Sequence, residues 1–201
     1  ISGGSEKGTY RFGYTNQDGT GVMPNSSLMK NNYILNASYD ILEDLTISTS
    51  ANYINTQGKG RTSTGYNDNI MSMFRQWYNV GVDMQQQKDL YFLTGRNVTW
   101  NRKGPDNPDP IYWDNPYWTR YENYQTDQRN RLIGYVQADW KLTNALSVMG
   151  RAAIDTYSEL LEERRAVGSV ATPFGVDYPD VQSGYVRRTR AFSETNVDFM
   201  F

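Results

Sequence analysis

The sequence predicts an all-β fold, an antiparallel sheet of about six strands, and three observations lead to this prediction. Several segments alternate apolar and polar residues with a period of two, the pattern of a strand that has two different faces. Short polar turns join some of these segments into pairs, and long polar stretches separate the pairs. Hydrophobic residues make up only 38% of the chain although aromatic residues reach 14%, so the composition does not favour an ordinary buried core.

The first complete hairpin is predicted in residues 33–53, YILNASYDILEDLTISTSANY, with its turn at Glu43 and Asp44. In its second strand every other residue is apolar or aromatic, apart from one threonine, and the residues between them carry hydroxyl or amide groups. This alternation predicts that the two faces of the strand meet different surroundings. The apolar side of this strand includes Leu45, Ile47, Ala51 and Tyr53.

The second hairpin is predicted in residues 131–157, RLIGYVQADWKLTNALSVMGRAAIDTY, with its turn at Thr143 and Asn144. The same alternation runs through both of its strands, so they too have one apolar side. This side includes Leu132, Val136, Trp140, Val148 and Ile154. Single strands in residues 9–16 and 192–201 complete the predicted sheet.

Three long connections are predicted, at residues 17–30, 56–125 and 160–188. The middle one is too long to be a structureless connection in a compact domain. We expect a short helix in its segment NDNIMSMFRQWYNV, because apolar residues recur there at positions i, i+3, i+4 and i+7. These residues are Ile70, Met73, Phe74 and Trp77, with Asn67 or Asp68 as the expected N-cap.

The asymmetry between short turns at one end of the strands and long loops at the other is typical of outer-membrane β-barrels. The strands are also long enough to cross the hydrocarbon layer, which takes about 9–11 tilted residues. We therefore interpret the chain as a segment of a large transmembrane antiparallel β-barrel, with residues 56–125 as an extracellular loop region. The apolar rows would contact lipid, and the hydroxyl rows would face a wet lumen or a folded plug. Tyr33, Tyr53 and Trp140 would then mark the rims of the bilayer.

A soluble β-sandwich with a tyrosine-rich face, such as a secreted binding module, remains the alternative fold. The composition excludes several functions under either interpretation. The net charge of −2 provides no basic footprint for nucleic acid. The chain has no cysteine and no histidine, so it has no thiolate metal site and no Ser-His-Asp triad. We predict no enzymatic activity and no cofactor, and we interpret the run Glu162 to Arg165 as mutually paired, solvated charges.

The segment WNRKGPDNPDPIYWDNPYWTRYENY, residues 100–124, is the best candidate for ligand binding. Flat aromatic side chains stand there beside amides and carboxylates, which is the combination that binds sugars or peptides. The candidate ligand-binding residues are Trp100, Tyr112, Trp113, Asn115, Tyr117 and Trp118. Two alternatives stay open. In one, the aromatic residues hold the loop together and pack against a partner protein; in the other, Asp106, Asp109 and Asp114 bind a calcium ion.

Several stretches resemble one family in both order and spacing. These are GGSEK, NQDG and NASYDILEDLTIS in the first quarter of the chain, then NPYWTRYENYQTDQRNRLIGYVQADWKLTNALSVMGRAAIDTY and LLEERRAVGS. They look like the SusC/RagA-type TonB-dependent transporters, or TonB-dependent receptors, of Bacteroidota outer membranes. The resemblance covers most of the chain, although no single motif is sharply specific.

The resemblance implies a roughly 22-stranded barrel whose lumen holds a plug domain, with the plug and the remaining strands outside these residues. It also implies a SusD-like surface lipoprotein as partner, energy from TonB-ExbB-ExbD through the plug, and import of oligosaccharides or peptides. The expected function is therefore nutrient uptake across the outer membrane. The alternative is a SusC-like barrel that serves as a structural scaffold in a larger outer-membrane complex and transports nothing.

Overall fold

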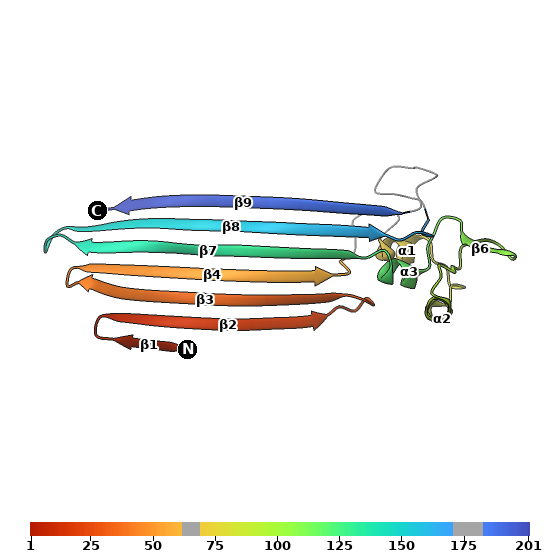
Figure 1. The fold of residues 1–201 in the computed structure, drawn as a ribbon, viewed down its shortest axis with the longest axis horizontal. Coiled ribbons are helices and arrows are strands. Elements are labelled where there is room, and N and C mark those ends of the chain that lie inside the picture. Colours follow the sequence, from red (N-terminus) through yellow and green to blue (C-terminus); the bar gives the residue numbers. More distant parts are fainter. Residues whose placement is uncertain (62–68, 171–182) are drawn as a thin grey trace.

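The computed structural model describes residues 1–61, 69–170 and 183–201. One antiparallel sheet dominates it, with the strand order β1-β2-β3-β4-β7-β8-β9 (Figure 1). This confirms the predicted all-β class. The sheet is open, because β1 and β9 form its two edges. Its strands are β1 (Ser2–Ser5), β2 (Gly8–Thr20), β3 (Ser27–Leu42), β4 (Leu45–Lys59), β7 (Gln125–Lys141), β8 (Ser147–Arg165) and β9 (Gly184–Met200).

The two predicted hairpins are present and lie side by side. Tyr33 of β3 pairs with Tyr53 of β4 in the first hairpin, and Trp140 of β7 pairs with Val148 of β8 in the second. β4 and β7 join the hairpins although more than 60 residues separate them along the chain, and Leu45 lies opposite Trp140 there. The alternation in the sequence therefore predicted both the hairpins and the side of each strand that is apolar.

The predicted long connections at 17–30 and 160–188 were wrong in their bounds. β2 continues to Thr20 and β3 begins at Ser27, while β8 continues to Arg165 and β9 begins at Gly184. Apolar residues in the missed ends are consecutive, as Leu28 and Met29 or Leu160 and Leu161 are, so the two-residue alternation stops there although the backbone ladder continues. The short strand β1 was missed as well, because two of its four residues are glycines.

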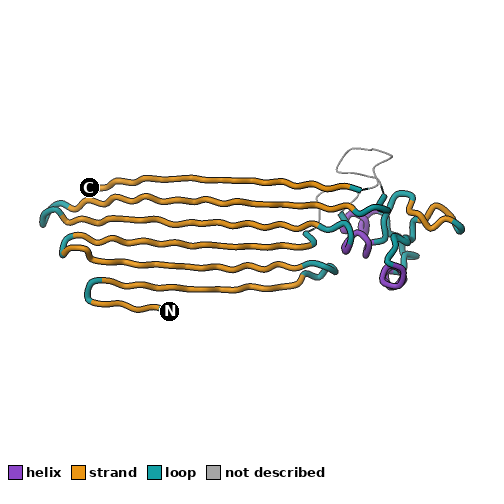
Figure 2. Tube along the Cα trace, viewed as in Figure 1, coloured by secondary structure: helices purple, strands orange, loops and turns teal. Residues whose placement is uncertain are grey.

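Residues 69–124 fold into a unit at one end of the sheet, and the short turns lie at the other end (Figure 2). We call it the loop unit. Its elements are α1 (Ile70–Gln76), α2 (Met84–Thr94), α3 (Pro116–Tyr121) and a small hairpin of β5 (Arg102–Gly104) and β6 (Asn107–Pro110).

The helix predicted from apolar spacing is α1, and its N-cap is Asn69, whose Oδ1 accepts from the backbone N–H groups of Met71 and Ser72. The predicted caps Asn67 and Asp68 lie outside the described residues. Helices α2 and α3 were not predicted, because α2 is rich in glutamine and α3 has only six residues.

The buried apolar side chains of the described residues lie in the loop unit and not in the sheet. They are Ile70, Met73, Tyr91, Trp113 and Trp118. No second layer covers either face of the sheet in the described part of the chain, so this chain does not have the architecture of a soluble sandwich.

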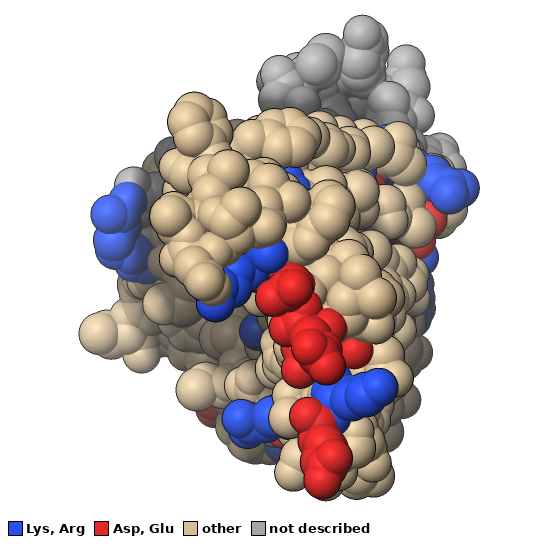
Figure 3. Space-filling model, turned by 90° about the vertical axis from the view of Figure 1, so that its left-hand side faces the viewer, with Lys and Arg blue, Asp and Glu red and all other residues tan. Residues whose placement is uncertain are grey.

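Charged side chains gather at the end that carries the short turns (Figure 3). Exposed residues of these turns and strand ends include Glu6, Lys7, Glu43, Asp44 and Lys141. Both signs of charge are present, so this end has a mixed polar surface.

Candidate functional site

One face of the sheet, here called the apolar face, is formed by residues that lie opposite one another in β2, β3, β4, β7, β8 and β9. Side chains in cross-strand register share a face and touch their neighbours. The apolar face consists of Tyr10, Phe12, Tyr14, Tyr33, Leu35, Ala37, Tyr39, Leu45, Ile47, Thr49, Ala51, Tyr53, Leu132, Gly134, Val136, Ala138, Trp140, Val148, Gly150, Ala152, Ile154, Thr195, Val197 and Phe199. None of these residues carries a charge, and all the residues predicted to face lipid are among them.

Large side chains of the apolar face are exposed in this chain. Tyr39 is 54% exposed, Val136 55% and Phe199 76%. Soluble proteins rarely expose contiguous apolar patches of more than a few hundred Å² unless the patch binds a partner or a membrane. The apolar face is therefore a surface that needs an apolar environment outside this chain.

A row of tyrosines bounds the apolar face on the side of the loop unit. Tyr14, Tyr33 and Tyr53 lie opposite one another on β2, β3 and β4. The ring centroids of Tyr14 and Tyr33 are 4.9 Å apart, and those of Tyr33 and Tyr53 are 6.1 Å apart. Trp140 lies at the opposite boundary, close to the β7–β8 turn. The sequence predicted Tyr33, Tyr53 and Trp140 at these two boundaries.

The next row on the same face is made of amides, and we call it the amide row: Asn16, Asn31, Asn55 and Asn130, which lie opposite one another. The Asn16 Nδ2 donates to Asn31 Oδ1 at 2.9 Å, and Asn55 Nδ2 donates to Asn130 Oδ1 at 2.6 Å. The amide row thus replaces apolar contacts by hydrogen bonds along one line across the sheet. The sequence did not predict it, because its members are far apart in the chain.

The tyrosine hydroxyls point to the amide row. The Tyr14 hydroxyl donates to Asn31 Oδ1 at 2.7 Å, and the Tyr53 hydroxyl donates to Asn130 Oδ1 at 3.1 Å. Each ring therefore has its apolar body on the apolar side and its polar tip on the amide side. Side chains of this kind are favoured where one end is apolar and the other is wet.

The opposite face, here called the polar face, carries ion pairs on β7, β8 and β9. Arg131 holds both carboxylate oxygens of Asp155, at 2.9 and 2.5 Å. A second pair joins Arg151 and Asp198 at 2.8 Å. The side chains of both pairs are 29–43% exposed, so each pair contributes little to stability.

The part of the polar face on β3 and β4 is mostly hydroxyl and amide. The Thr46 hydroxyl donates to Asp40 at 2.6 Å, and the Ser50 hydroxyl donates to Asn36 at 2.8 Å. These groups satisfy one another without removing charges from water. This part of the polar face is therefore suited to water or to a polar protein surface.

In the loop unit, α1 packs against the candidate ligand-binding segment. Ile70 and Met73 of α1 form a buried cluster with Trp113, and Met23 from the β2–β3 turn packs at its edge. The ring of Trp77 stacks on that of Trp113, with 5.4 Å between the centroids. Burial of these side chains attaches the loop unit to the turn between β2 and β3.

Asn115 is the central polar residue of the loop unit and is fully buried. Its Nδ2 donates to the carbonyls of Gln87 and Val98, both at 2.8 Å. Its Oδ1 accepts from the backbone N–H of Tyr117 at 2.8 Å and so caps α3. The amide of Asn115 is therefore occupied by the backbone of three segments.

Asp114 and Asn123 attach the segment that follows β8. The Asp114 carboxylate accepts from the Val170 N–H at 2.7 Å, and the Asn123 Oδ1 accepts from the Ala166 N–H at 2.8 Å. The indole N–H of Trp118 donates to the Ser169 hydroxyl at 2.8 Å. The loop unit is thereby joined to β8 by several hydrogen bonds.

Arg120 attaches the turn between β2 and β3 to α3. Its Nε donates to the Pro24 carbonyl at 2.9 Å, and Asn25 Nδ2 donates to the Arg120 carbonyl at 2.8 Å. Burial lowers the pKa of Arg120 from its ordinary value. This lowering reflects removal of the guanidinium from water, and the neighbouring Tyr121 offsets part of it.

Two tyrosines of the loop unit are held as neutral hydrogen-bonding groups. Burial raises the pKa of Tyr78 well above its ordinary value. The pKa of Tyr91 is raised by burial and by Glu122, whose Oε1 accepts from the Tyr91 hydroxyl at 2.7 Å. Both hydroxyls therefore stay protonated at any physiological pH.

The predicted ligand-binding residues fall into two groups. Trp113 and Trp118 are only 7% and 9% exposed, and Asn115 is buried, as expected if this segment holds the loop together. Tyr112 is 68% exposed, while Trp100 and Tyr117 are partly buried. The structure thus brings the six residues into one unit but leaves mainly Tyr112 accessible, and its role in binding stays a prediction.

An exposed aromatic and aliphatic pair on α2 was not predicted. Phe92 is 55% and Leu93 85% exposed. The ring of Phe92 packs edge-on against Tyr121, with 5.3 Å between the centroids, and against Tyr117 at 6.1 Å. No periodicity marks these residues, because the apolar residues at the end of α2 are consecutive, from Leu90 to Leu93.

The calcium alternative finds no support among the described residues, where no group of three acidic, histidine or cysteine side chains could hold a metal ion. Asp109 lies 3.5 Å from Lys103, and Asp114 is buried in its hydrogen bonds. In the predicted charge run, Glu162 pairs with Arg164 at 3.1 Å, whereas Arg165 is buried and donates to the Val170 carbonyl.

Among the described residues, no helix combines the length and apolar character that crossing a membrane requires. The comparison with protein-family models finds no match to this chain. No curated protein is significantly similar to it either.

Proposed function

We propose that this chain forms part of the wall of an outer-membrane β-barrel, that of a SusC/RagA-like TonB-dependent transporter. The observation that carries the proposal is the pair of unlike faces on one long antiparallel sheet. The apolar face has no charge, and a tyrosine row and a tryptophan bound it on opposite sides. The polar face carries ion pairs and hydroxyl groups along the same stretch of the strands as the apolar face.

The dimensions of the apolar face support this proposal. From Leu45 to Tyr53 the strand β4 advances by about 27 Å, taking about 3.4 Å per residue. At the usual tilt this covers most of the apolar band, roughly 25 Å tall, of such barrels. In this arrangement the apolar face contacts lipid and the polar face contacts the lumen or a plug.

Transport with a SusD-like lipoprotein, powered by TonB-ExbB-ExbD, rests on the resemblance of the sequence motifs. The substrates would be oligosaccharides or peptides. The position of the loop unit supports an external binding role, because it lies at the end opposite the short turns. Tyr112, Phe92 and Leu93 are among the exposed apolar side chains that it offers to a substrate or to the lipoprotein.

Paired cysteine variants test the membrane topology. The 201 residues contain no cysteine, so Val136→Cys and Gln137→Cys, neighbours on opposite faces of β7, can be introduced one at a time into the full-length protein. We expect lipids with brominated acyl chains to quench a fluorophore at position 136 and not at position 137. A fluorophore at Tyr112→Cys serves as the exposed control. Equal quenching at 136 and 137 would contradict the proposal.

Growth experiments separate transport from scaffolding. We expect deletion of the gene to abolish growth on one oligosaccharide or peptide, with the outer membrane otherwise intact. Growth on every candidate nutrient together with a poorly assembled outer membrane would instead favour the scaffold alternative.

A further inference from the structure

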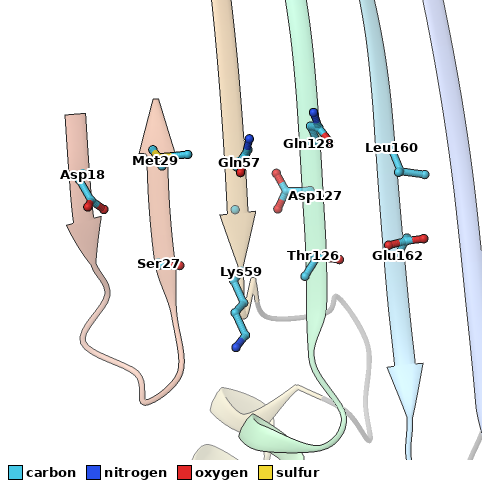
Figure 4. A pocket seen from close by; sticks show the side chains of 11 residues that line it. Asp18, Ser27, Met29, Gln57, Lys59, Thr126, Asp127, Gln128, Leu160 and Glu162 are labelled. Atoms are coloured by element: carbon cyan, nitrogen blue, oxygen red, sulfur yellow. The ribbon is translucent and has the colours of Figure 1, made fainter. Parts of the chain in front are cut away.

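A hollow of about 420 Å³ lies on the side of the apolar face, between the amide row and the end of the strands that carries the loop unit (Figure 4). Side chains of β2, β3, β4, β7 and β8 contribute to it. It is lined by Asp18, Ser27, Met29, Gln57, Gly58, Lys59, Thr126, Asp127, Gln128, Leu160 and Glu162.

The strand register places this hollow on the same face as the tyrosines. On β4, Tyr53 is followed at two-residue steps by Asn55 of the amide row, then Gln57, then Lys59. Gln57 lies opposite Gln128 on β7. The same face therefore changes from apolar residues to tyrosines, then to amides, and finally to the hollow.

The lining of the hollow is rich in groups that both donate and accept hydrogen bonds. The amides of Gln57 and Gln128 are exposed at the same height on adjacent strands. Asp18 and Glu162 add carboxylates, which accept hydrogen bonds from hydroxyls and repel phosphate. Leu160 adds an apolar surface against which a sugar ring can lie.

Lys59 is the cation in this lining, and its ammonium group lies over the aromatic ring of Tyr124. Its Nζ lies 4.9 Å from the centroid of Tyr124, and Arg164 approaches the same ring at 5.0 Å. Asp127 is paired with Arg61 at 2.6 Å. The charges of the hollow are thus partly engaged within the protein, and Glu162 accepts hydrogen bonds from Arg164 and Tyr185. The two glutamine amides are exposed, and Gln57 Nε2 also donates to Asn55 Oδ1 at 3.4 Å.

We propose that this hollow binds the sugar headgroup of a glycolipid in the outer leaflet. The inference rests on the proposed membrane placement, because only then do acyl chains run along the apolar face and headgroups stand at the height of the amide row. A sugar fits the lining better than a phosphate, since its hydroxyls pair with amides and carboxylates alike.

The test uses the full-length protein reconstituted in vesicles of phosphatidylethanolamine and phosphatidylglycerol that contain monoglucosyl diacylglycerol. Lipids retained by the protein are counted by native mass spectrometry. We expect the glucosyl lipid to be enriched over phosphatidylglycerol, and the double variant Gln57→Ala/Gln128→Ala to reduce this enrichment about tenfold, because two hydrogen-bonding partners are lost. Gln137→Ala, the same change on the polar face of β7, should leave it unaltered.

The outcomes distinguish this inference from the proposed function. A protein that does not float with the vesicles would contradict the membrane placement itself. A protein that inserts but retains no excess of glucosyl lipid, or whose double variant retains it as well as the unmodified protein, would overturn the glycolipid site alone.

A second measurement covers the case in which the double variant does not assemble. The unmodified protein is irradiated in vesicles with a glucosyl lipid that carries a diazirine on its sugar. We expect the label on the segments around Gln57 and Gln128. Labelling elsewhere without these segments would also overturn the inference.

Discussion

The sheet and the loop unit differ in where their apolar side chains lie. In the loop unit, Ile70 and Met73 are 3% and 2% exposed and pack against other side chains of the same chain. In the sheet, Phe12 is 41% and Val197 59% exposed. The loop unit therefore makes its own core, as a segment that folds in water must, whereas the sheet needs an apolar medium that this chain does not provide.

The polar side chains of the two regions also differ in their burial. The buried amides of Asn115 and Gln87 lie inside the loop unit and bind backbone groups. The polar groups of the sheet, such as Arg131 and Asp155, pair on a surface that stays partly open. Removing a polar side chain should therefore reduce the free energy of unfolding strongly in the loop unit and weakly in the sheet. Adding a charge should reduce it strongly only on the apolar face.

The largest effect is expected for Asn115→Ala. It removes the side-chain partner of the Val98 carbonyl and of the Tyr117 N–H inside the loop unit, together with the second hydrogen bond of the Gln87 carbonyl. We expect local destabilisation by about 5 kcal/mol, since each buried group left unpaired costs about 1–3 kcal/mol. Hydrogen–deuterium exchange of α2 and α3 in the full-length protein measures this loss.

The matched control for that change is Asn107→Ala. Asn107 is exposed, and its side chain accepts one hydrogen bond from the N–H of Asp109. Exchange in α2 and α3 should stay as in the unmodified protein. Equal protection of these helices in Asn115→Ala would show that the buried amide does not hold the loop unit together.

A charge on the apolar face should have the next largest effect. Val136→Arg places a guanidinium near the middle of this face and should reduce the free energy of folding into bilayers by about 2–4 kcal/mol. Gln137→Arg, on the polar face of the same strand, should change it by less than about 1 kcal/mol. Refolding of both variants into lipid vesicles, followed by urea titration, compares them, and equal losses would remove the distinction between the two faces.

A smaller effect is expected in the tyrosine row. Tyr33 lies between Tyr14 and Tyr53, so Tyr33→Ala removes both ring contacts and should destabilise the sheet by about 1–2 kcal/mol. Tyr33→Phe keeps the ring and should recover most of this loss. The same urea titration measures both variants, and a loss in Tyr33→Phe as large as in Tyr33→Ala would assign the effect to the hydroxyl.

The smallest effect is expected for the ion pair of Arg131 and Asp155. Their side chains are 36% and 29% exposed. A double-mutant cycle with Arg131→Ala and Asp155→Ala should give a coupling energy of about 0.5–1 kcal/mol, decreasing with added salt. A coupling of several kcal/mol would mean that the polar face is shielded from water.

The parts of the fold that could be predicted are those where the alternation of apolar and polar residues is visible within a single strand. Leu45, Ile47 and Ala51 alternate with hydroxyl residues, so strand and face were both evident. The last residues of β4, Thr56 to Lys59, fell within the predicted connection 56–125, because both faces are polar there and only the pairing with β7 shows that they form a strand.

The candidate site was less predictable than the sheet. Asn115 and Tyr112 stand three residues apart in the same aromatic segment, yet one is buried and the other is mostly exposed. The difference depends on α2 and on Val98, whose positions follow from packing within the loop unit and not from any local pattern.

The sequence by itself determined the strand pattern, the side of each strand that is apolar, and the absence of charge among the residues of the apolar face, because these depend only on the two-residue period of an extended backbone. Tertiary structure alone decided which rows meet across the sheet, and with them the amide row and the hollow beside it. Asn16 and Asn130 come into one line only through the pairing of β2, β3, β4 and β7, and hydrogen bonding between distant strands leaves no periodicity in the chain.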